Sequence, residues 1–422
     1  MNESMNNVVD KERVVIIGGG PGGTACGLAL QRLANEMGKP VQITLIEGKQ
    51  FTNEKHYNQC VGVLSSPLPQ LLEEKLGIPF PHNLCQIEIQ GYVVHSSGEQ
   101  IRLEGNDDES YALRRVKFDQ YMLDKVSDHG IDVFPGRAID LEFHEDRVIV
   151  YTESLPIEAD VVIGAFGLDE GSAAMFARHT PYRPPRAMNS LVTKFSSNSN
   201  EESNDLSGYV HAYLLSNPRI EFGAITPKCI HCTINIAGDT VDAPLMDSFL
   251  NHPSVREVLP DLDRGNSEKS NDLVYFKGRF PRSLASGYYG DRYVMIGDAS
   301  GLVRAFKGKG VTTAVLTGVR AAETILKYGY SKQTFQDHYR SANQDIVQDL
   351  PYGRAMRILT IFMSRTKLMD PVLRAAQSTP ELQAALFDAV SAHALYREVF
   401  AKILRPKPVW AVLKALVSGQ SG

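Results

Sequence analysis

Hydrophobic residues form continuous runs at several places along the chain, a pattern typical of strands buried in a parallel sheet. The first run, 14–17, leads into a glycine-rich turn at 18–23 and then into an apolar helical segment. A second strand is predicted over 42–46. Two later apolar runs, at 160–165 and 293–296, predict further strands of the same sheet.

The pattern changes between the last two of these runs. From 187 to 276 apolar and polar residues alternate, which predicts antiparallel strands with one buried face. Residues 85–104 predict a further hairpin, with its turn at 96–98. Because parallel elements stand on both sides of the alternating region, we expect an α/β domain that the chain leaves and re-enters.

Helical patterns dominate the remainder of the chain. Helices are predicted at 68–76, 116–129 and 311–327 and over most of the sequence after 332, with strands at 131–134 and 138–152. The polar run 196–204 predicts a mobile loop.

The composition of the 422 residues is that of a globular protein, with 43% hydrophobic and 22% charged residues. No run of 18 or more apolar residues occurs, so we expect no spanning helix. The polar start of the chain, 1–7, differs from a secretory signal, and we expect a cytoplasmic protein. Five cysteines without framework spacing agree with a reducing compartment.

Two of the cysteines stand in the run Cys229-Ile230-His231-Cys232, whose residue types could ligate zinc. The run looks like part of a strand, in which positions i and i+3 point to opposite faces. His82 and Cys85 would complete a site only by chance. We therefore expect half-buried thiols here and no metal.

The first glycine turn carries a chemical signal. Gly18 permits a tight turn, Gly20 lets the backbone approach a pyrophosphate, and Gly23 allows close packing of helix and strand. The N–H groups at the start of the helix face the phosphates. Glu47 ends the second strand, where its carboxylate accepts ribose hydroxyls and repels a 2′-phosphate. The turn as a whole, which predicts a dinucleotide site, consists of Gly18, Gly19, Gly20, Pro21, Gly22 and Gly23.

A second glycine-rich segment lies far along the chain. Gly297 and Asp298 follow a buried strand, and Gly308, Gly310 and Val311 open the next helix. An acid at such a strand end can bind the ribityl hydroxyls of a flavin, and the helix N–H groups can stabilise negative charge on its ring. Alternatively, Asp298 caps a helix. Together with the first turn, the segment favours FAD over NAD.

The chain resembles the FAD-dependent reductases and monooxygenases of the para-hydroxybenzoate hydroxylase type, and within them the geranylgeranyl reductase family. The resemblance spans roughly residues 12–345. Two further stretches support it. Residues 114–123 are similar to the pattern Arg-x-x-Phe-Asp-x-x-Leu, which implies that Arg115 contacts FAD. Residues 159–167 are similar to Asp-x-x-Ile-Gly-Ala-Asp-Gly, with Phe166 in place of the second Asp.

Similarity to reductases rather than hydroxylases rests on two partly matching motifs. Cys60 and Gly62 match the family's Lys-Pro-Cys-Gly-Gly-Gly, and Phe222, Pro227 and Lys228 match Tyr-x-Trp-x-Phe-Pro-Lys. Large aromatic residues are missing from the second motif, which implies a larger or reshaped substrate cavity. The remaining departures are Ala224 and Thr226 in that motif and Ala305 in place of a Pro.

The resemblance implies an α/β fold, with a Rossmann-like FAD-binding domain, an inserted antiparallel-sheet substrate domain and a helical C-terminal region. We expect the FAD-binding domain over 12–84, 110–185 and 277–345, the substrate domain over 85–109 and 186–276, the helical region over 346–422, and disorder over 1–11.

Cys60 is the best candidate for a reactive residue beside the flavin, and its alternative role is a small buried side chain. Tyr57 and His56 are candidate proton donors, or else packing residues. Phe222 and Pro227 are the expected substrate contacts. No second dinucleotide fingerprint occurs, so NAD(P)H would visit transiently, or a small redox protein would supply electrons.

The C-terminal segment 353–422 carries ten Lys/Arg and four Asp/Glu, a net charge of +6 against −11 for the remaining residues. Its basic residues are interleaved with apolar ones along helices, which argues against nucleic acid. We expect that the segment either packs as a helical cap on the core or makes a peripheral contact with the inner face of an anionic membrane.

Three hypotheses follow. The first is an FAD-dependent reductase that saturates C=C bonds of an isoprenoid or similar lipid by hydride transfer. The second is a flavin-dependent monooxygenase or a halogenase-like enzyme acting on an aromatic or natural-product substrate. The third is an FAD-bound protein without enzymatic activity.

Overall fold

The computed structural model describes residues 11–49, 60–104, 109–195, 206, 208–229, 231–259, 273–303 and 309–418. Several positions named above lie outside these ranges, namely His56, Tyr57, Ala305, Gly308, the loop 196–204 and all but the last residue of 1–11.

Parallel strands form the sheet beneath the first glycine turn. Within the described residues its order is β18-β19-β12-β1-β2-β8, and only β18 and β19 pair antiparallel. The predicted apolar runs supply β1, β2, β12 and β19, as expected for strands covered on both faces. The strand bounds are β1 Glu12–Ile17, β2 Val41–Ile46, β8 Asp132–Phe134, β12 Val161–Gly164, β18 Tyr289–Gly290 and β19 Tyr293–Met295.

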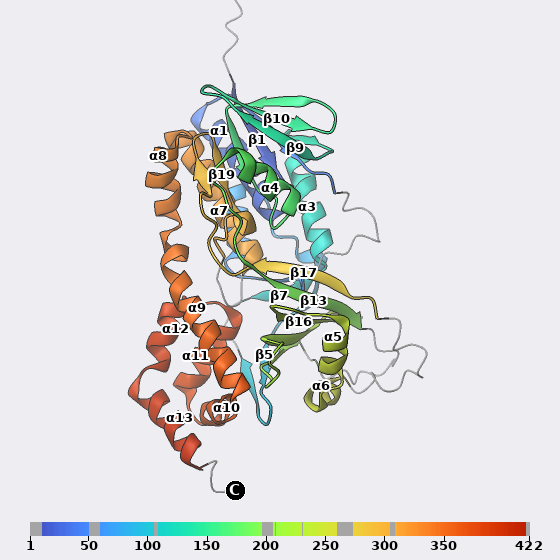
Figure 1. The fold of residues 1–422 in the computed structure, drawn as a ribbon, viewed down its shortest axis with the longest axis vertical. Coiled ribbons are helices and arrows are strands. Elements are labelled where there is room, and N and C mark those ends of the chain that lie inside the picture. The colour runs from blue at the N-terminus through green and yellow to red at the C-terminus, as the bar shows by residue number, and fades with distance from the viewer. Residues whose placement is uncertain are drawn as a thin grey trace, which may run out of the picture.

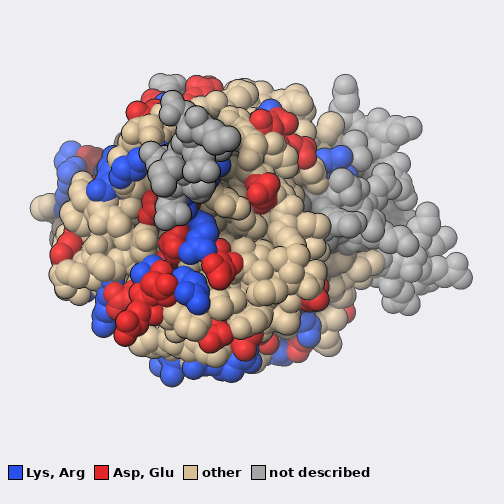
Figure 2. Space-filling model, turned by 90° about the horizontal axis from the view of Figure 1, so that it is seen from above, with Lys and Arg blue, Asp and Glu red and all other residues tan. Residues whose placement is uncertain are grey.

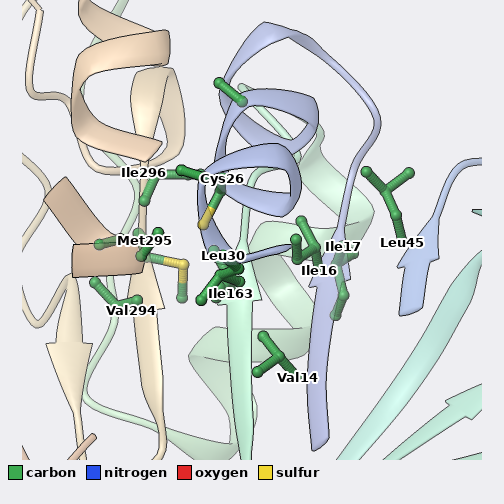
Figure 3. Packing of buried hydrophobic residues seen from close by; sticks show 14 of the residues in the cluster. Val14, Ile16, Ile17, Cys26, Leu30, Leu45, Ile163, Val294, Met295 and Ile296 are labelled. Carbon is green, nitrogen blue, oxygen red and sulfur yellow. The ribbon is translucent and has the colours of Figure 1, made fainter. Parts of the chain in front are cut away.

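Apolar side chains of this parallel sheet pack against α1 (Pro21–Met37), as Figure 3 shows. Ile16 and Leu30 are both 0% exposed, and burial of such a side chain contributes roughly 1.5–3 kcal/mol. Cys26 is fully buried in the same core. The helix α7 (Gly310–Tyr328), predicted over 311–327, packs beside α1.

A second, mixed sheet has the order β17-β13-β16-β15-β14-β5-β6 within the described residues. The alternating region from 187 to 276 forms most of it. The expectation of antiparallel pairing is wrong for one pair of strands. β14 pairs in parallel with β5, the first strand of the hairpin β5–β6. The bounds are β5 Gly91–His95, β6 Gln100–Glu104, β13 Ala187–Phe195, β14 Tyr209–Tyr213, β15 Phe222–Pro227, β16 Cys232–Gly238 and β17 Phe276–Pro281.

A small sheet has the order β3-β7-β4 within the described residues and takes up part of the predicted hairpin. Residues 85–88 do not continue that hairpin, since β4 pairs with β7. The bounds are β3 Val63–Ser65, β4 Cys85–Glu88 and β7 Ser110–Leu113, and a separate antiparallel meander consists of β9 Ala138–Phe143, β10 Val148–Thr152 and β11 Pro156–Ala159.

The two faces of the mixed sheet have different covers (Figure 1). Ile225, Ile234 and Ile236 pack against α5 and α6. Val94 and Ala212, from neighbouring strands, face the C-terminal helices instead. Because side chains alternate along a strand, each strand contributes to both covers.

The C-terminal helices begin with α9, which runs down from the parallel-sheet domain and leads into a bundle beside the mixed sheet (Figure 1). Among the described residues, no helix is both long and apolar enough to cross a membrane. The helix bounds are α2 Leu68–Leu71 with a π-helical turn Leu72–Leu76, α3 Arg115–Asp128, α4 Glu170–His179, α5 Ala243–Leu250, α6 Pro253–Val258, α8 Lys332–Thr334 with a π-helical turn Phe335–Arg340, α9 Gln344–Arg365, α10 Met369–Gln377, α11 Pro380–Ser391, α12 Tyr396–Ile403 and α13 Pro406–Ser418.

Seen from above, the described surface carries Lys and Arg interspersed with Asp and Glu (Figure 2). Exposed ion pairs such as Arg178–Asp140, at 3.1 Å, contribute roughly 1 kcal/mol or less. The fold is therefore held by the buried apolar clusters rather than by its surface charges.

Candidate functional site

The turn between β1 and α1 has the geometry that its glycines predict. Gly18 has a φ of 112°, and a β-carbon there would lie 2.6 Å from the Ala165 carbonyl oxygen. A β-carbon on Gly23 would lie 1.9 Å from the Gly18 carbonyl oxygen. A β-carbon on Gly20 would meet none of the residues that the structure describes within 4 Å, which leaves open space above this residue among them. Gly20 is the N-cap of α1 and gives it no side-chain cap, which leaves N–H groups pointing to that space.

The Glu47 side chain is hydrogen-bonded to the first glycine turn. Its Oε2 accepts a hydrogen bond from the Gly19 N–H at 2.8 Å, and its Oε1 accepts one from the Lys49 N–H at 2.7 Å. The half-buried carboxylate is thus held at the end of β2, beside the open space above Gly20.

The second glycine segment meets the first through α7. A β-carbon on Gly318 would lie 2.5 Å from the Gly22 carbonyl oxygen, so the two helices approach closely at this point. Gly310 and Val311 begin α7, whose N-cap Lys309 provides no side-chain cap. A β-carbon on Gly310 would also meet no described residue within 4 Å. Within the described part of the chain, two uncapped helix N-termini therefore face open space.

Gly297 and Asp298 lie in a short 3-10 turn directly after β19, and Gly297 has a φ of 56°. Asp298 does not cap α7, because Lys309 holds that position. Burial raises the pKa of Asp298 to about 6, and the charge of Arg115 partly opposes the shift. The two side chains therefore lie close enough to interact across the site.

Arg115 is the first residue of α3, and its Nε donates to the Asp119 carboxylate at 2.7 Å. Burial alone would lower the pKa of Arg115, but the charge of Asp119 and a contact with the Cys60 thiol leave it raised. Cys60 itself is half-buried, and its Sγ accepts from the Gly62 N–H at 3.4 Å. The sequence-predicted Arg115 and Cys60 are thus neighbours.

Lys228 is a second cation within electrostatic range of Cys60. Only 8% of this lysine is exposed, and its Nζ donates to the Leu113 carbonyl oxygen at 2.5 Å and the Gly62 carbonyl oxygen at 3.5 Å. Burial lowers the pKa of Lys228 to about 8, although the nearby Cys60 opposes the shift. The motif comparison matched this lysine without giving it a role, because only the fold reveals its burial.

An apolar cavity of about 240 Å³ lies between the mixed sheet and the C-terminal helices. The sheet contributes Val94, Ala212 and Phe222 to its wall, and α9 and α13 contribute Leu359 and Leu413. Phe222, an expected substrate contact, therefore lines an apolar chamber. Pro227 does not, because it lies five residues further along β15 and points to the opposite face.

One expectation about local structure was wrong. Cys229 and His231 do not belong to a strand, because β15 ends at Pro227 and β16 begins at Cys232, and the Lys228 N–H donates to the His231 carbonyl oxygen at 2.9 Å. Cys229 is exposed and Cys232 is buried. No group of three or more His, Cys, Asp or Glu suited to a metal occurs among the described residues.

Phe166, which stands where the family pattern has Asp, packs against Phe176 with ring centroids 5.5 Å apart. Phe176 is fully buried, so Phe166 extends the aromatic core beside β12. The substitution thus supplies packing at the end of this strand.

The chain is similar to known reductases and to a halogenase. The digeranylgeranylglycerophospholipid reductase of Methanococcus vannielii is 23% identical over 395 residues, which span 87% of this chain and 90% of the relative. A geranylgeranyl bacteriochlorophyll reductase-like protein from Thermoplasma acidophilum has a TM-score of 0.62 at 18% identity, with 96% of each chain covered. The halogenase PltM has a TM-score of 0.66 at 14% identity, covering 95% of this chain and 88% of its own. No family model matches the chain.

The chain shares its fold with solved flavin-dependent enzymes, such as the flavin-dependent brominase Bmp2. Reductase-like and halogenase structures share it, as expected for a fold that supports different chemistries.

Proposed function

We propose that this protein is an FAD-dependent reductase that saturates C=C bonds in the chain of an isoprenoid or similar lipid. The observation that carries the proposal is the course of β15, which has Phe222 in the apolar cavity and leads to Lys228 beside Cys60. Six residues of extended strand span about 20 Å, comparable to the length of a long prenyl chain. The similarity to the Methanococcus reductase supports the same substrate class.

The residues of the two glycine segments fit FAD. Open space above Gly20 and Gly310 would receive the pyrophosphate and the flavin ring, opposite uncapped helix N-termini. Glu47 would bind the adenosine ribose and Asp298 the ribityl hydroxyls. Arg115 would complete the contacts, and the full proposed set is Gly18, Gly20, Pro21, Gly22, Gly23, Glu47, Arg115, Gly297, Asp298, Gly308, Gly310 and Val311.

When bound, the reduced flavin supplies the hydride. The protein's own residues hold the alkene and exclude water. Ala224 and Thr226 lie between Phe222 and Lys228 on the same face of β15, and their small side chains leave room for a chain. Cys60 interacts with both cations, Arg115 and Lys228, and we propose that it contacts the reacting end of the substrate. Tyr57 is a further candidate proton donor, and NAD(P)H or a small redox protein would reduce the flavin.

A peripheral membrane contact would suit a lipid substrate. Large apolar side chains on α9 and α13 are exposed, among them Phe362 at 55% and Trp410 at 71%. Leu359 and Leu413 belong both to this exposed surface and to the cavity wall. Lys and Arg are interleaved with them, as in segments that dock on anionic lipid. We propose that the lipid chain enters the cavity between α9 and α13.

The test begins with the purified protein reconstituted with FAD and reduced anaerobically with dithionite. Addition of a geranylgeranyl lipid should reoxidise the flavin without oxygen, and mass spectrometry should show a gain of two hydrogens per reduced double bond. The Cys60→Ser variant should reoxidise more slowly while keeping its flavin spectrum. The surface variant Cys229→Ser serves as its matched control.

Different outcomes would contradict the proposal. Reoxidation that requires oxygen and oxygenates or halogenates an aromatic compound would favour the monooxygenase or halogenase-like alternative. Bound FAD that no lipid reoxidises and no donor reduces would favour a protein without enzymatic activity. Stopped-flow reduction with NADH, NADPH and a ferredoxin would identify the class of donor.

A further inference from the structure

The helices α1 and α7 lie side by side and run in the same direction (Figure 1). A β-carbon on Gly22 would lie 3.4 Å from the Ala314 carbonyl oxygen, and one on Gly318 would lie 3.1 Å from the Cys26 backbone nitrogen. Because Gly22 is the second residue of α1, this helix begins near the level of Ala314. Gly310 precedes Ala314 by four residues, about 6 Å along the helix axis. The N-terminus of α7 therefore extends beyond that of α1 by about one helical turn.

The turn of Gly297 and Asp298 lies beside the same part of α7 as the start of α1. The Gly297 N–H donates to Thr317 Oγ1 at 2.9 Å, and a β-carbon on Gly297 would lie 3.2 Å from Ala314 Cβ. If the pyrophosphate of FAD binds at the start of α1 and its ribityl chain at Asp298, as proposed above, the flavin ring extends toward the N-terminus of α7. Lys309, the N-cap residue of α7, is at this level.

The Lys309 side chain is held in place by the end of β3. Its Nζ donates to the Ser66 carbonyl oxygen at 2.5 Å. Ser66 directly follows β3, and its N–H donates to the Glu109 carbonyl oxygen at 3.2 Å. A half-buried ammonium is therefore fixed at the N-terminus of α7 by a part of the chain that is far away in the sequence.

A cation in this position opposes the dipole of the helix. The N-terminus of a helix carries a partial positive charge, which disfavours a second positive charge and favours an anion. The first turn of α7 contains no Asp or Glu that could compensate for the ammonium. Lys327, in the last turn of the same helix, has the favourable placement. An anion that binds at this end of the site would account for the placement of Lys309.

The reduced flavin ring matches that anion better than the pyrophosphate does. The pyrophosphate is expected at the start of α1, about one helical turn away from the start of α7. Two electrons and one proton convert the neutral ring into an anion, and fixed charges near the ring tune this conversion. A cation beside the ring therefore stabilises the reduced state more than the oxidised state.

We propose that Lys309 sets the reduction potential of the flavin, because its ammonium, held by the Ser66 carbonyl oxygen, lies at the ring end of the site and favours the reduced, anionic cofactor. The inference rests on FAD as the cofactor in the proposed function. It adds a residue that controls how readily the flavin accepts electrons from NAD(P)H or a small redox protein.

The midpoint potential of the FAD-loaded protein tests this by anaerobic reduction in the presence of a reference dye. Lys309→Met should lose affinity for reduced FAD about ten-fold more than for oxidised FAD, which lowers the two-electron potential by about 30 mV. Sulfite adds to the oxidised ring and makes it an anion, so it should bind about ten-fold more weakly to this variant. Lys309→Gln, which has an amide donor for Ser66 but no charge, gives the same test if Lys309→Met does not fold.

Two further variants separate the charge of Lys309 from its hydrogen bond. Lys309→Arg keeps the charge and should retain the potential and the sulfite affinity of the parent. Lys327→Met removes an exposed lysine from the other end of α7 and should change neither property. Equal losses in Lys309→Arg and Lys309→Met would overturn the inference, because the charge would not be their cause.

An unchanged potential in Lys309→Met, with weaker binding of FAD in both redox states, would also overturn it and leave Lys309 as a structural tether. The proposed function fails separately. If the potential falls as expected but no lipid reoxidises the flavin, the reductase proposal is contradicted and the role of Lys309 is supported. If lipid reoxidises the flavin but the potential does not depend on Lys309, only the present inference fails. A protein that takes up no FAD would overturn both.

Discussion

The backbone of Gly318 in α7 lies so close to Gly22 that a β-carbon on Gly318 would stand 2.5 Å from the Gly22 carbonyl oxygen. This contact joins the first glycine turn to the helix that follows the second. We predict that Gly318→Ala separates α1 from α7 and lowers FAD affinity at least ten-fold. Titration of the apoprotein with FAD, followed by flavin fluorescence, measures the change.

Gly27→Ala is the matched control for this prediction. Gly27 lies on α1, and a β-carbon there would meet Ile131 and Ile16 at an ordinary 3.5 Å. Alanine favours a helix over glycine by up to about 1 kcal/mol, so this variant should be as stable as the parent or more so. Equal FAD affinity of both variants would contradict the role given to the Gly22–Gly318 contact.

The stability of the apoprotein should depend on pH through Asp298. Burial raises the pKa of this carboxyl to about 6, above that of an unfolded Asp. The folded state therefore holds the proton more tightly, and stability is lost as pH rises from about 4 to 6. Asp298→Asn should make the apoprotein more stable by about 1–3 kcal/mol above pH 6, with a smaller gain near pH 4.

Urea unfolding of parent and variant at pH 4.5 and 7.5 checks this prediction. The same variant should bind FAD more weakly, because the amide replaces a carboxylate acceptor for the ribityl hydroxyls. A gain in stability that is equal at both pH values would show that burial of the charge is not its cause.

A buried ion pair fastens the C-terminal helices to the mixed sheet. Arg357 of α9 donates from Nε to the Glu221 carboxylate at 2.7 Å and makes a second bond to it from Nη2. The two side chains are only 15% and 8% exposed. Removal of one partner from such a pair costs about 3–5 kcal/mol, so Glu221→Gln should lower the melting temperature strongly.

The double variant Glu221→Leu/Arg357→Met removes both charges and should recover much of the lost stability, because apolar side chains can replace a buried pair. Differential scanning calorimetry compares the three proteins. A double variant no more stable than Glu221→Gln would mean that the position requires the pair itself.

Trp410 offers a direct report on membrane contact. It is the single tryptophan of the sequence and is 71% exposed on α13. If α13 docks on anionic lipid, the emission of Trp410 should shift to shorter wavelength with anionic vesicles and remain unchanged with neutral ones. Val417→Ser on the same helix should weaken vesicle binding, whereas Ile139→Ser on β9, also an exposed apolar residue, should leave it unaltered. No spectral shift with either lipid would remove the support for docking.

The sequence was sufficient for elements whose signal is local. The run 14–17, the glycines after it and Glu47 predicted β1, the turn and the end of β2, since a strand, a tight turn and a helix start each have their own residue preferences. The close approach of Gly22 and Gly318 could not be predicted from the sequence, because a glycine within a helix does not indicate which other helix packs against it. The proposed FAD contacts and domain boundaries stay predictions.

Long-range arrangement was harder to predict. Alternation over 187–276 gives the faces of strands but not their neighbours, so the parallel pairing of β14 with β5 was missed. The apolar residues around Cys229 and Cys232 look like part of a strand, which concealed the break between β15 and β16. From the sequence, Lys228 would be interpreted as a solvent-exposed lysine. Its burial depends on hydrogen bonds to the carbonyl oxygens of Leu113 on β7 and of Gly62, which only the fold brings near it.

The pairing of β5 with β14 also has a consequence for how the chain folds. During synthesis the hairpin β5–β6 emerges more than a hundred residues before the strand that covers its open edge. The parallel sheet is likewise incomplete until β19 has left the ribosome. Both halves of the molecule must therefore mature late and together, and an exposed strand edge in the nascent chain makes chaperone assistance an expected part of its biogenesis.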